Sequence, residues 1–361
     1  MDSIGTNPYS LAKLSSSKSA SYSIDDHESS SQERLSTGFS SQSISFVEQS
    51  SHESTLELFK SIPRNKSASK LMQQIISKAQ PDELNKLLSY LLPNIAILMV
   101  DVYGNYICQT LFHNCSANHR LSILQHLKPA LVSVSYNPRG THALQNLIAM
   151  MNLREEEDIY QTAFKGHIAK MSKDINASHV VQRLLVTVNN RYFITREVKG
   201  CVEELALDKL GVCVIKKCCN DPVIMNEVLG KALMLMQHPY GNYALQTVID
   251  FWGEEAAHEF ICAIQGRVSQ LCLQKFASNV IEKALKVEVI RSCIIRELLS
   301  NGKVQELLSS QYGSYVLRTA SLYCDEEFKQ DLSRNIKDAS DNMYNAKLKP
   351  LWDEILNNLC K

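Results

Sequence analysis

The stretch Gln237-His-Pro-Tyr-Gly-Asn-Tyr-Ala-Leu-Gln-Thr-Val-Ile249 has a near copy earlier in the chain, Asp101-Val-Tyr-Gly-Asn-Tyr-Ile-Cys-Gln-Thr-Leu-Phe112. Both copies contain an aromatic residue, Gly, Asn, Tyr, two apolar residues and Gln, followed by a mostly apolar run. Two copies of so unusual a string indicate an internal repeat. A repeat decides the fold, because each unit packs only on its neighbours and the array grows as one body.

Six weaker copies bring the total to eight. The first variable position of the motif, here called position one, falls at residues 69, 105, 141, 178, 212, 242, 278 and 314. Successive copies are 36, 36, 37, 34, 30, 36 and 36 residues apart. A unit of about 36 residues has room for three short helices, so the sequence predicts an all-α solenoid of eight three-helix units.

The second unit illustrates the expected layout. Pro93 suits the first turn of a short helix that ends near Asp101. Gly104 then requires either a positive φ or a close backbone approach, and the alanine found at this place in three units (68, 177 and 277) argues against an obligatory positive φ. A helix follows, which we expect to bury Ile107, Cys108, Leu111 and Phe112 and to place Asn105, Tyr106 and Gln109 on the opposite face.

Two regions depart from the regular period. Residues 212–242 span only 30 positions, so we expect the fifth unit to lack about one helical turn and to disturb the regular curvature. Residues 325–361 lie beyond the last motif helix, which needs a closing helix pair, and their many charges suit a polar terminal capping element.

Composition separates a tail from the repeats. Residues 1–55 contain 19 Ser, three basic and seven acidic residues and no lasting hydrophobic period, so we expect a disordered tail. Of the 38 basic and 38 acidic residues in the whole chain, 35 and 31 remain in the predicted repeat domain, 56–361. This excess is too small for a non-specific nucleic-acid binder, so any nucleic-acid binding must rest on a local face.

Several function classes lack support in the sequence. The eleven Cys show no metal-like spacing and suit reduced thiols of a cytosolic protein, and we expect no metal and no cofactor. We find no signal peptide, no phosphate-binding loop and no nucleophile elbow, and we expect no enzyme activity. Two stretches without charged residues, 87–100 and 232–249, are better explained as buried solenoid helices than as membrane spans.

Three positions of the motif share a chemical pattern. Position one is small and polar in seven copies: Ser69, Asn105, Thr141, Ser178, Asn242, Ser278 and Ser314. Position two of these copies is Lys70, Tyr106, His142, His179, Tyr243, Asn279 and Tyr315. Position five is Gln73, Gln109, Gln145, Gln182, Gln246, Glu282 and Arg318. We expect all three positions on the exposed face, where planar side chains stack on single-stranded bases and polar side chains bind base edges.

In a single helix, such Gln and Asn side chains would be simply solvated and the Tyr would belong to the core; seven helices with one pattern favour base recognition. The signature Tyr-Gly-Asn-Tyr-x-x-Gln resembles that of the Pumilio (PUF) family, from about Leu56 to the end of the chain. The forms at 140–145 and 211–215 resemble divergent plant members. The resemblance implies a curved, right-handed superhelical α-solenoid of eight three-helix Pumilio repeats, with one base bound per repeat.

The resemblance also implies base preferences and an RNA that runs antiparallel to the protein, so that the last repeat binds the 5′ base. Asn with Gln implies uracil at the second and sixth repeats, and Ser with Gln implies adenine at the first and fourth. Ser278 with Glu282 implies guanine, since only guanine presents the N1–H and exocyclic amine donors together on that edge.

Three repeats depart from the family pattern. The eighth has Ser314 with Arg318, whose donors match the O2 and N3 acceptors of cytosine. The third has Thr141 with Gln145 and should tolerate adenine. The fifth is degenerate: Val212, Cys213 and Lys216 lack the polar residue and the stacking side chain, and Lys216 suits a phosphate. The expected site is therefore close to 5′-CGUNAAUA-3′.

The resemblance implies a cytoplasmic, monomeric protein that binds single-stranded RNA in mRNA 3′ UTRs, recruits protein partners through its convex face, and represses translation or promotes mRNA decay. It implies no membrane association. The alternatives are an α-solenoid scaffold for protein interactions and a ribosome-assembly factor with degenerate base recognition. The near-neutral charge disfavours the second of these.

Overall fold

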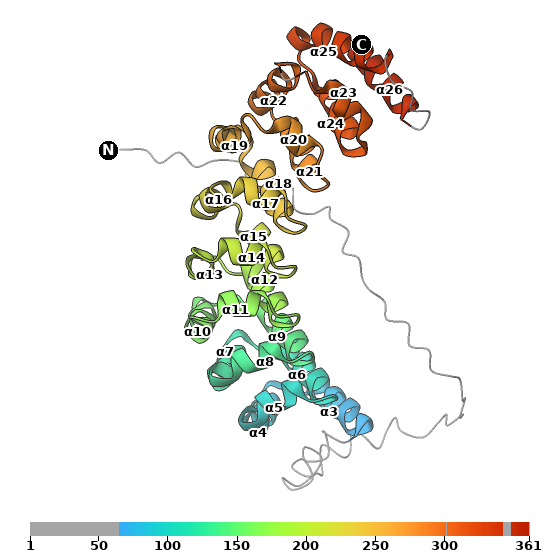
Figure 1. Ribbon diagram of the computed structural model, residues 1–361. Coiled ribbons are helices and arrows are strands. Elements are labelled where there is room, and N and C mark those ends of the chain that lie inside the picture. Colours follow the sequence, from blue (N-terminus) through green and yellow to red (C-terminus); the bar gives the residue numbers. More distant parts are fainter. Residues whose placement is uncertain (1–64, 301, 342–347, 361) are drawn as a thin grey trace, which may run out of the picture. The chain divides into compact units, whose positions relative to one another are not determined.

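The computed structural model describes residues 65–300, 302–341 and 348–360, and this part of the chain forms helices and turns without any strand. The predicted tail, 1–55, and residues 56–64 of the predicted repeat domain lie outside the described residues. Figure 1 shows the helices in stacked layers that follow the order of the chain. The predicted all-α solenoid is confirmed.

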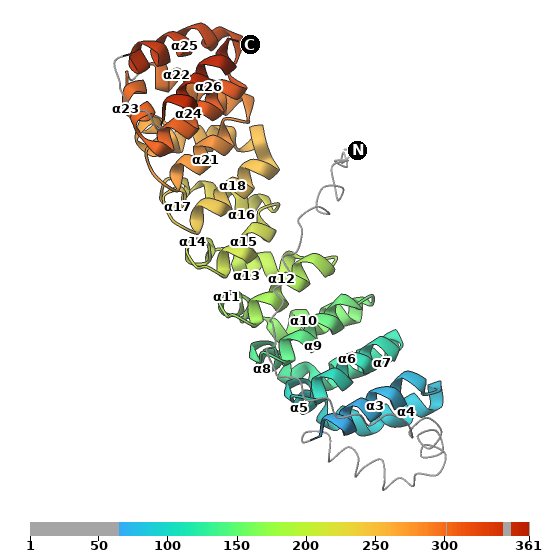
Figure 2. The ribbon, with the colours of Figure 1, turned by 90° about the vertical axis from the view of Figure 1, so that its right-hand side faces the viewer.

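All eight positions one lie near the start of a helix, and we call these eight the motif helices. They are α3 (Lys66–Lys78), α6 (Gly104–Asn114), α9 (Gly140–Ala149), α12 (Ala177–Thr187), α15 (Gly211–Cys218), α18 (Gly241–Trp252), α21 (Ala277–Ala284) and α24 (Gln311–Tyr323). Each motif helix packs against the next one along the chain. Figures 1 and 2 show the resulting row, which runs from α3 to α24.

Two further rows complete the solenoid. The outer helices are α4 (Pro81–Leu91), α7 (Ala117–Leu127), α10 (Arg154–Phe164), α13 (Tyr192–Val198), α16 (Pro222–Leu229), α19 (Ala257–Ile264) and α22 (Glu288–Ser300). The short helices before the second to eighth motifs are α5 (Ile95–Val100), α8 (Leu131–Tyr136), α11 (Ile168–Ser172), α14 (Val202–Ala206), α17 (Ala232–Met236), α20 (Val268–Cys272) and α23 (Val304–Ser309). The 3₁₀ turns η2 (Leu92–Asn94), η3 (Lys128–Ala130) and η4 (Gly253–Ala256) join neighbouring helices.

The second unit follows the predicted layout. Pro93 lies in η2, directly before α5, and the four predicted core residues of α6 are fully buried. The Asp101 carboxylate stabilises the turn that leads into α6, because its Oδ1 accepts hydrogen bonds from the amides of Tyr103 (2.9 Å) and Gly104 (2.7 Å). Asn137, Asp174, Asp208 and His238 accept the equivalent pair of bonds in the next units.

Close backbone approach explains the glycine of the motif. The glycines with positive φ lie elsewhere in the described chain, and a Cβ at Gly104 would lie 2.7 Å from the carbonyl oxygen of Leu98. The approach is tighter at Gly313, where a Cβ would lie 2.5 Å from the Leu307 carbonyl oxygen and 2.7 Å from its Cα. Of the two explanations offered by the sequence, the structure therefore selects the close approach.

Replacing Gly313 by alanine is expected to lower the free energy of unfolding by about 1–3 kcal/mol, the usual cost of overpacking. The control is Gly230→Ala, because Gly230 has φ −59° and its nearest obstacle, the Asn226 carbonyl oxygen, would lie 3.3 Å from the new Cβ. Denaturant titration measures both variants, and equal stability of the two would contradict the explanation.

The fifth unit is shorter, as predicted from its 30-residue spacing. Its motif helix α15 and its outer helix α16 have 8 residues each. The seventh unit, at the regular spacing, has an equally short motif helix, α21, but a 13-residue outer helix, α22. Asp221 ends the turn after α15 and caps α16 through a 2.9 Å bond from the Val223 amide to its Oδ1. The Trp252 indole N–H donates to the Cys219 carbonyl at 2.6 Å and so joins the fifth and sixth units.

A helix pair closes the C-terminal end, as the sequence predicted. It consists of α25 (Glu326–Asp341) and α26 (Lys349–Leu359). The second of these packs beside α24 as one motif helix packs beside another. Its Trp352 is 3% exposed, and the Trp352 indole donates to the Leu308 carbonyl at 3.2 Å.

A buried ion pair joins the second and third units. Glu156 of α10 is fully buried, and its Oε1 lies 3.4 Å from Nε of Arg120 in α7. The Glu156 Oε2 accepts from the amides of Asn152 and Leu153, both at 2.9 Å. Arg120 also donates to the Cys115 carbonyl (3.2 Å) and to Oδ1 of Asn152 (2.8 Å). These bonds offset part of the cost of burying the two charges. Arg120 Nε and Glu156 Oε1 make no hydrogen bond, so at these two atoms the 3.4 Å charge contact alone replaces water.

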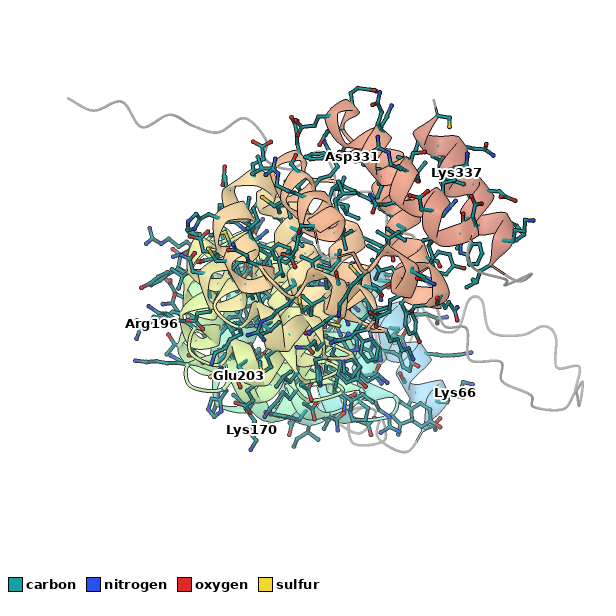
Figure 3. All side chains as sticks on the ribbon, turned by 45° about the horizontal axis from the view of Figure 1, so that its top comes forward. Lys66, Lys170, Arg196, Glu203, Asp331 and Lys337 are labelled. Atoms are coloured by element: carbon teal, nitrogen blue, oxygen red, sulfur yellow. The ribbon has the colours of Figure 1, made fainter. Side chains whose placement is uncertain are left out.

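Charged side chains on the outer flank make weaker contacts. Figure 3 shows Lys170 and Arg196 at the edge of the stack, with Glu203 on the same flank. Glu203 pairs with Lys231 of the next unit at 2.8 Å, with both side chains about half exposed. Exposed pairs of this kind contribute little to stability, so the apolar interior holds the stack together.

The segment Pro81–Val100 is long and apolar enough to cross a membrane by length and composition, with a mean hydropathy of 1.2. The structure interrupts it at η2, and Leu88, Leu91, Ile95 and Leu98 are buried against neighbouring helices. These contacts are those of core helices in a repeat protein.

Candidate nucleic-acid interface

Position two forms the exposed part of the motif-helix row. The side chains of Tyr106, Tyr243 and Tyr315 are 55%, 50% and 45% exposed, although tyrosine at helical spacing usually belongs to the core. The remaining position-two residues of the seven regular motifs are exposed as well: Lys70, His142, His179 and Asn279. The row therefore presents three phenol rings and two imidazole rings to solvent, each on a rigid helix.

Position one does not lie on the exposed face, and this part of the prediction is wrong. All seven polar residues at this position are buried, with exposed fractions between 0% and 6%. Six of the seven side chains, all except Ser178, donate to backbone carbonyls instead. Asn105 Nδ2 donates to Asp101 (2.9 Å) and Val102 (3.0 Å), and Ser69 Oγ donates to Tyr103 of the next unit (2.8 Å). A turn carbonyl enclosed by packing needs such a donor, which explains the small polar side chain.

Position five is half-buried and is oriented by position one. The Gln Nε2 donates to the position-one oxygen in four units, at 3.1 Å for Gln73, 3.2 Å for Gln109, 3.3 Å for Gln145 and 2.9 Å for Gln246. The bond holds the Nε2 end of each amide and so restricts the amide orientation before any ligand arrives. Position one is thus buried beneath position five, and its contribution to the exposed face is to orient the position-five side chain.

The other polar motifs vary this arrangement. Ser178 is fully buried and its Oγ has no hydrogen-bond partner, while Gln182 above it is half-buried. Ser278 Oγ donates to the Lys275 carbonyl at 3.4 Å, and Ser314 Oγ donates to the Leu308 carbonyl at 2.9 Å. None of these hydroxyls is hydrogen-bonded to its own position-five residue, so the seventh and eighth units must orient Glu282 and Arg318 by other contacts.

Glu282 is the one carboxylate at position five. Its Oε2 accepts from the Thr319 hydroxyl of α24 at 3.0 Å. Burial raises the pKa of the Glu282 carboxyl, and the Thr319 hydrogen bond and the charges of Lys286 and Arg318 partly offset this rise. A half-buried carboxylate of this kind is a strong acceptor for paired N–H donors.

Arg318 pairs with the capping helix. Its Nε donates to Glu354 Oε1 of α26 at 2.8 Å, and both side chains are less than half exposed. The guanidinium of the eighth unit is therefore held by the element that closes the stack.

The fifth unit has no polar side chain at position one. Val212 is buried, Cys213 is half-buried and Lys216 is exposed. The Lys216 ammonium lies 5.8 Å from the centroid of the Tyr243 ring, which is a cation–π contact with the next motif helix.

Three residues that hold position five were missed from the sequence: Asn146, Thr319 and Glu354. The Asn146 amide donates to Gln109 Oε1 at 2.8 Å, and the other two make the contacts with Glu282 and Arg318 given above. Asn146 and Thr319 directly follow position five of their own helices, so the repeat spacing was the signal that could have identified them.

No metal or cofactor is implied by the residues around this interface. The described ranges contain no group of three or more His, Cys, Asp or Glu side chains arranged to hold a metal ion. The eleven Cys are free thiols, and burial raises the pKa of Cys218 and Cys219 to about 12, which leaves both as neutral thiols at physiological pH.

The segments of this chain that match a known repeat family recur with the spacing of the motif helices. The model of the Pumilio-family RNA-binding repeat matches residues 94–128, 167–193, 231–264 and 267–299. Pumilio homolog 12 of Arabidopsis thaliana is 32% identical over 265 residues, which cover 70% of this chain and 44% of that protein. A Pumilio domain-containing protein of Schizosaccharomyces pombe is 28% identical over 74% of this chain and 40% of its own length. The match thus spans less than half of each curated relative.

Solved structures give the same result at the level of the fold. The Puf4 RNA-binding domain bound to an HO endonuclease RNA 3′ UTR recognition sequence is 26% identical, with a TM-score of 0.72 over 82% of this chain and 97% of that one. PUF-8 in complex with PBE-RNA, 22% identical with a TM-score of 0.70, shares the fold. With the repeat period, the stacked motif helices and these matches together, the chain is a divergent, plant-type member of the Pumilio family of RNA-binding repeat proteins.

Proposed function

We propose that this chain binds single-stranded RNA in mRNA 3′ UTRs with sequence specificity, one base per repeat, and thereby represses translation or promotes mRNA decay. The observation that carries the proposal is the row of exposed, flat position-two side chains beside pre-oriented, half-buried position-five side chains. The Puf4 domain, similar in fold and sequence, is bound to a 3′ UTR recognition sequence.

The two kinds of side chain have different tasks. A base stacked on Tyr106, Tyr243 or Tyr315 contributes on the order of 1–3 kcal/mol whatever its identity, because every base has a π-face. Position five then selects the base through hydrogen bonds to its edge. Selection depends on a fixed donor and acceptor pattern, and the anchored Gln amides provide one.

The proposed site remains 5′-CGUNAAUA-3′, with the eighth repeat at the first base. Position one acts from below in this proposal, since it orients position five in four units. We expect little discrimination at the fourth base, because Lys216 offers a cation to a phosphate or a ring rather than an edge pattern. We further propose that the protein acts as a cytoplasmic monomer and recruits partner proteins through its outer helices.

The direct test of this proposal is a fluorescence anisotropy titration at one fixed salt concentration. The oligonucleotide 5′-CGUUAAUA-3′ should bind at least tenfold more tightly than its three variants at the second base, which corresponds to about 1.4 kcal/mol. The fully paired duplex of the same sequence should bind only non-specifically. Equal affinity for all four second bases would contradict base selection by the seventh repeat.

Acidification is expected to weaken this guanine preference early. Guanine donates two N–H groups, so it requires the ionised form of Glu282, and the raised pKa of Glu282 means that protonation begins at a higher pH than for an ordinary carboxyl group. The preference should therefore fall as pH falls through that pKa. Titrations from pH 7 to pH 5 measure it, with Glu282→Gln as the pH-independent control; a constant preference in the unmodified protein would refute the assignment.

The alternative, a protein-interaction scaffold, draws on the degenerate fifth unit and on the pairing of Arg318 with Glu354. It predicts that no RNA sequence is preferred and that variants at position five leave RNA affinity unchanged.

A further inference from the structure

Three position-five residues receive a polar contact from the next helix of the stack. Asn146 of α9 donates to Gln109 Oε1 (2.8 Å), Thr319 of α24 donates to Glu282 Oε2 (3.0 Å), and Glu354 of α26 accepts from Arg318 Nε (2.8 Å). The partners are 37, 37 and 36 residues apart, which is the length of one repeat. We call these the following-helix contacts.

The geometry of stacking produces these contacts. Asn146 directly follows position five of α9, and Thr319 directly follows position five of α24. Since α6 packs beside α9, and α21 beside α24, the residue after position five faces the position-five side chain of the preceding motif helix. Both Asn146 and Thr319 are half-buried, so water competes weakly for their partners.

The contact completes the orientation of Gln109. Its Nε2 is held by Asn105 Oδ1 at 3.2 Å, and its Oε1 is held by the Asn146 amide at 2.8 Å. An amide bound at both ends has one orientation, because a flip would place donor against donor and acceptor against acceptor. The remaining N–H and the remaining lone pair then point in fixed directions.

The contact with Glu282 has a different chemical consequence. Ser278 donates to the Lys275 carbonyl and gives Glu282 no bond, so the Thr319 hydroxyl is the hydrogen-bond donor that orients this carboxylate. A neutral donor to one oxygen favours the ionised form and fixes the carboxylate plane. Guanine needs both, because its two donors must meet two acceptor sites in one plane.

We propose that Asn146 and Thr319 are specificity-positioning residues, each of which sets the base preference of the repeat before its own. The inference rests on the proposed function, because it concerns the same bases. According to this proposal, the base preference of one repeat is set by residues of two repeats. A substitution in the third repeat then alters the base preference of the second, and a substitution in the eighth alters that of the seventh.

The sixth repeat can be compared directly with the second, because it lacks the following-helix contact. The sixth repeat has the same pair as the second, Asn242 with Gln246, and the same 2.9–3.2 Å anchor between them. The residue that corresponds to Asn146 is Lys283 of α21, whose ammonium pairs instead with Asp250 at 2.6 Å. Both repeats are proposed to bind uracil, yet only the second has the following-helix contact.

The first experiment uses Thr319→Val, which keeps the side-chain shape and removes the hydroxyl, and Thr319→Ser, which retains a hydroxyl. Affinities of the full-length variants are measured for the four oligonucleotides that differ at the second base and the four that differ at the first. Thr319→Val should lower the guanine preference by about tenfold and leave the first-base preference unchanged, while Thr319→Ser should keep most of it. An equal loss of affinity for all eight oligonucleotides would overturn the inference, because it would indicate a merely structural role.

The second experiment uses Asn146→Leu, of similar volume. The uracil preference at the seventh base should fall by about fivefold to tenfold, while the preference at the third base, bound by Gln246, should remain. Unchanged preference at the seventh base would overturn the inference for this contact. Absence of base preference in the unmodified protein would instead overturn the proposed function, so the two failures are distinguishable.

Discussion

Replacing Glu156 by alanine is expected to lower the free energy of unfolding by about 3–5 kcal/mol, the usual cost of leaving one partner of a buried ion pair uncompensated. Arg120 would keep its bonds to the Cys115 carbonyl and to Asn152, but its charge would remain in the interior without the carboxylate. The amides of Asn152 and Leu153 at the start of α10 would lose their shared acceptor. The variant thus combines an unpaired charge with an uncapped helix start.

Denaturant titration followed by circular dichroism measures this effect, with Glu155→Ala as the control. Glu155 is exposed in the same first turn of α10 and should change stability by less than about 0.5 kcal/mol. Glu156→Gln should fall between the two, since it keeps an acceptor and loses the charge. A cost for Glu156→Ala no larger than that of the control would refute the structural role of the pair.

Replacing Glu282 by glutamine is expected to reduce the preference for guanine at the second base by about 10- to 100-fold, or roughly 1–3 kcal/mol. The carboxylate offers only acceptors, whereas the amide exchanges one acceptor for a donor that opposes a guanine N–H. Competition titrations with the four second-base oligonucleotides measure the change.

The reciprocal variant provides a matched control at the sixth repeat. Asn242→Ser combined with Gln246→Glu recreates the Ser278 and Glu282 pair there and should shift the third base from uracil towards guanine. The second-base preference should not change. Retention of uracil at the third base would indicate that the position-five residue does not select the base.

Much of the fold could be predicted from the sequence, because the period and the motif carry it. The buried face of α6, the shorter fifth unit and the closing helix pair all follow from residue spacing and proline, glycine and charge positions. The exposure of position two was also correct. These features depend on contacts within one helix or on the order of the helices. Both can be read from the periodic placement of apolar residues along the sequence.

The burial of position one could not be predicted in the same way. On a helical wheel this position lies at the border of the apolar face, and the carbonyls that enclose it, such as Tyr103 beside Ser69, belong to a turn of the next unit. The following-helix contacts could be predicted only in part. The repeat spacing identifies Asn146 and Thr319 as equivalent positions, but their contacts with position five depend on how two adjacent helices are aligned along their axes, and this alignment is known only when both helices are placed.

Selection of bound sequences from a random RNA pool, at a fixed salt concentration, will show whether the motif helices select bases. We expect enrichment of an eight-base motif close to 5′-CGUNAAUA-3′, with guanine followed by uracil at the second and third bases and a weakly selected fourth base. A pool that shows no enrichment would contradict this expectation, and would leave the stacked motif helices as a fold shared with the Pumilio family without its base selection.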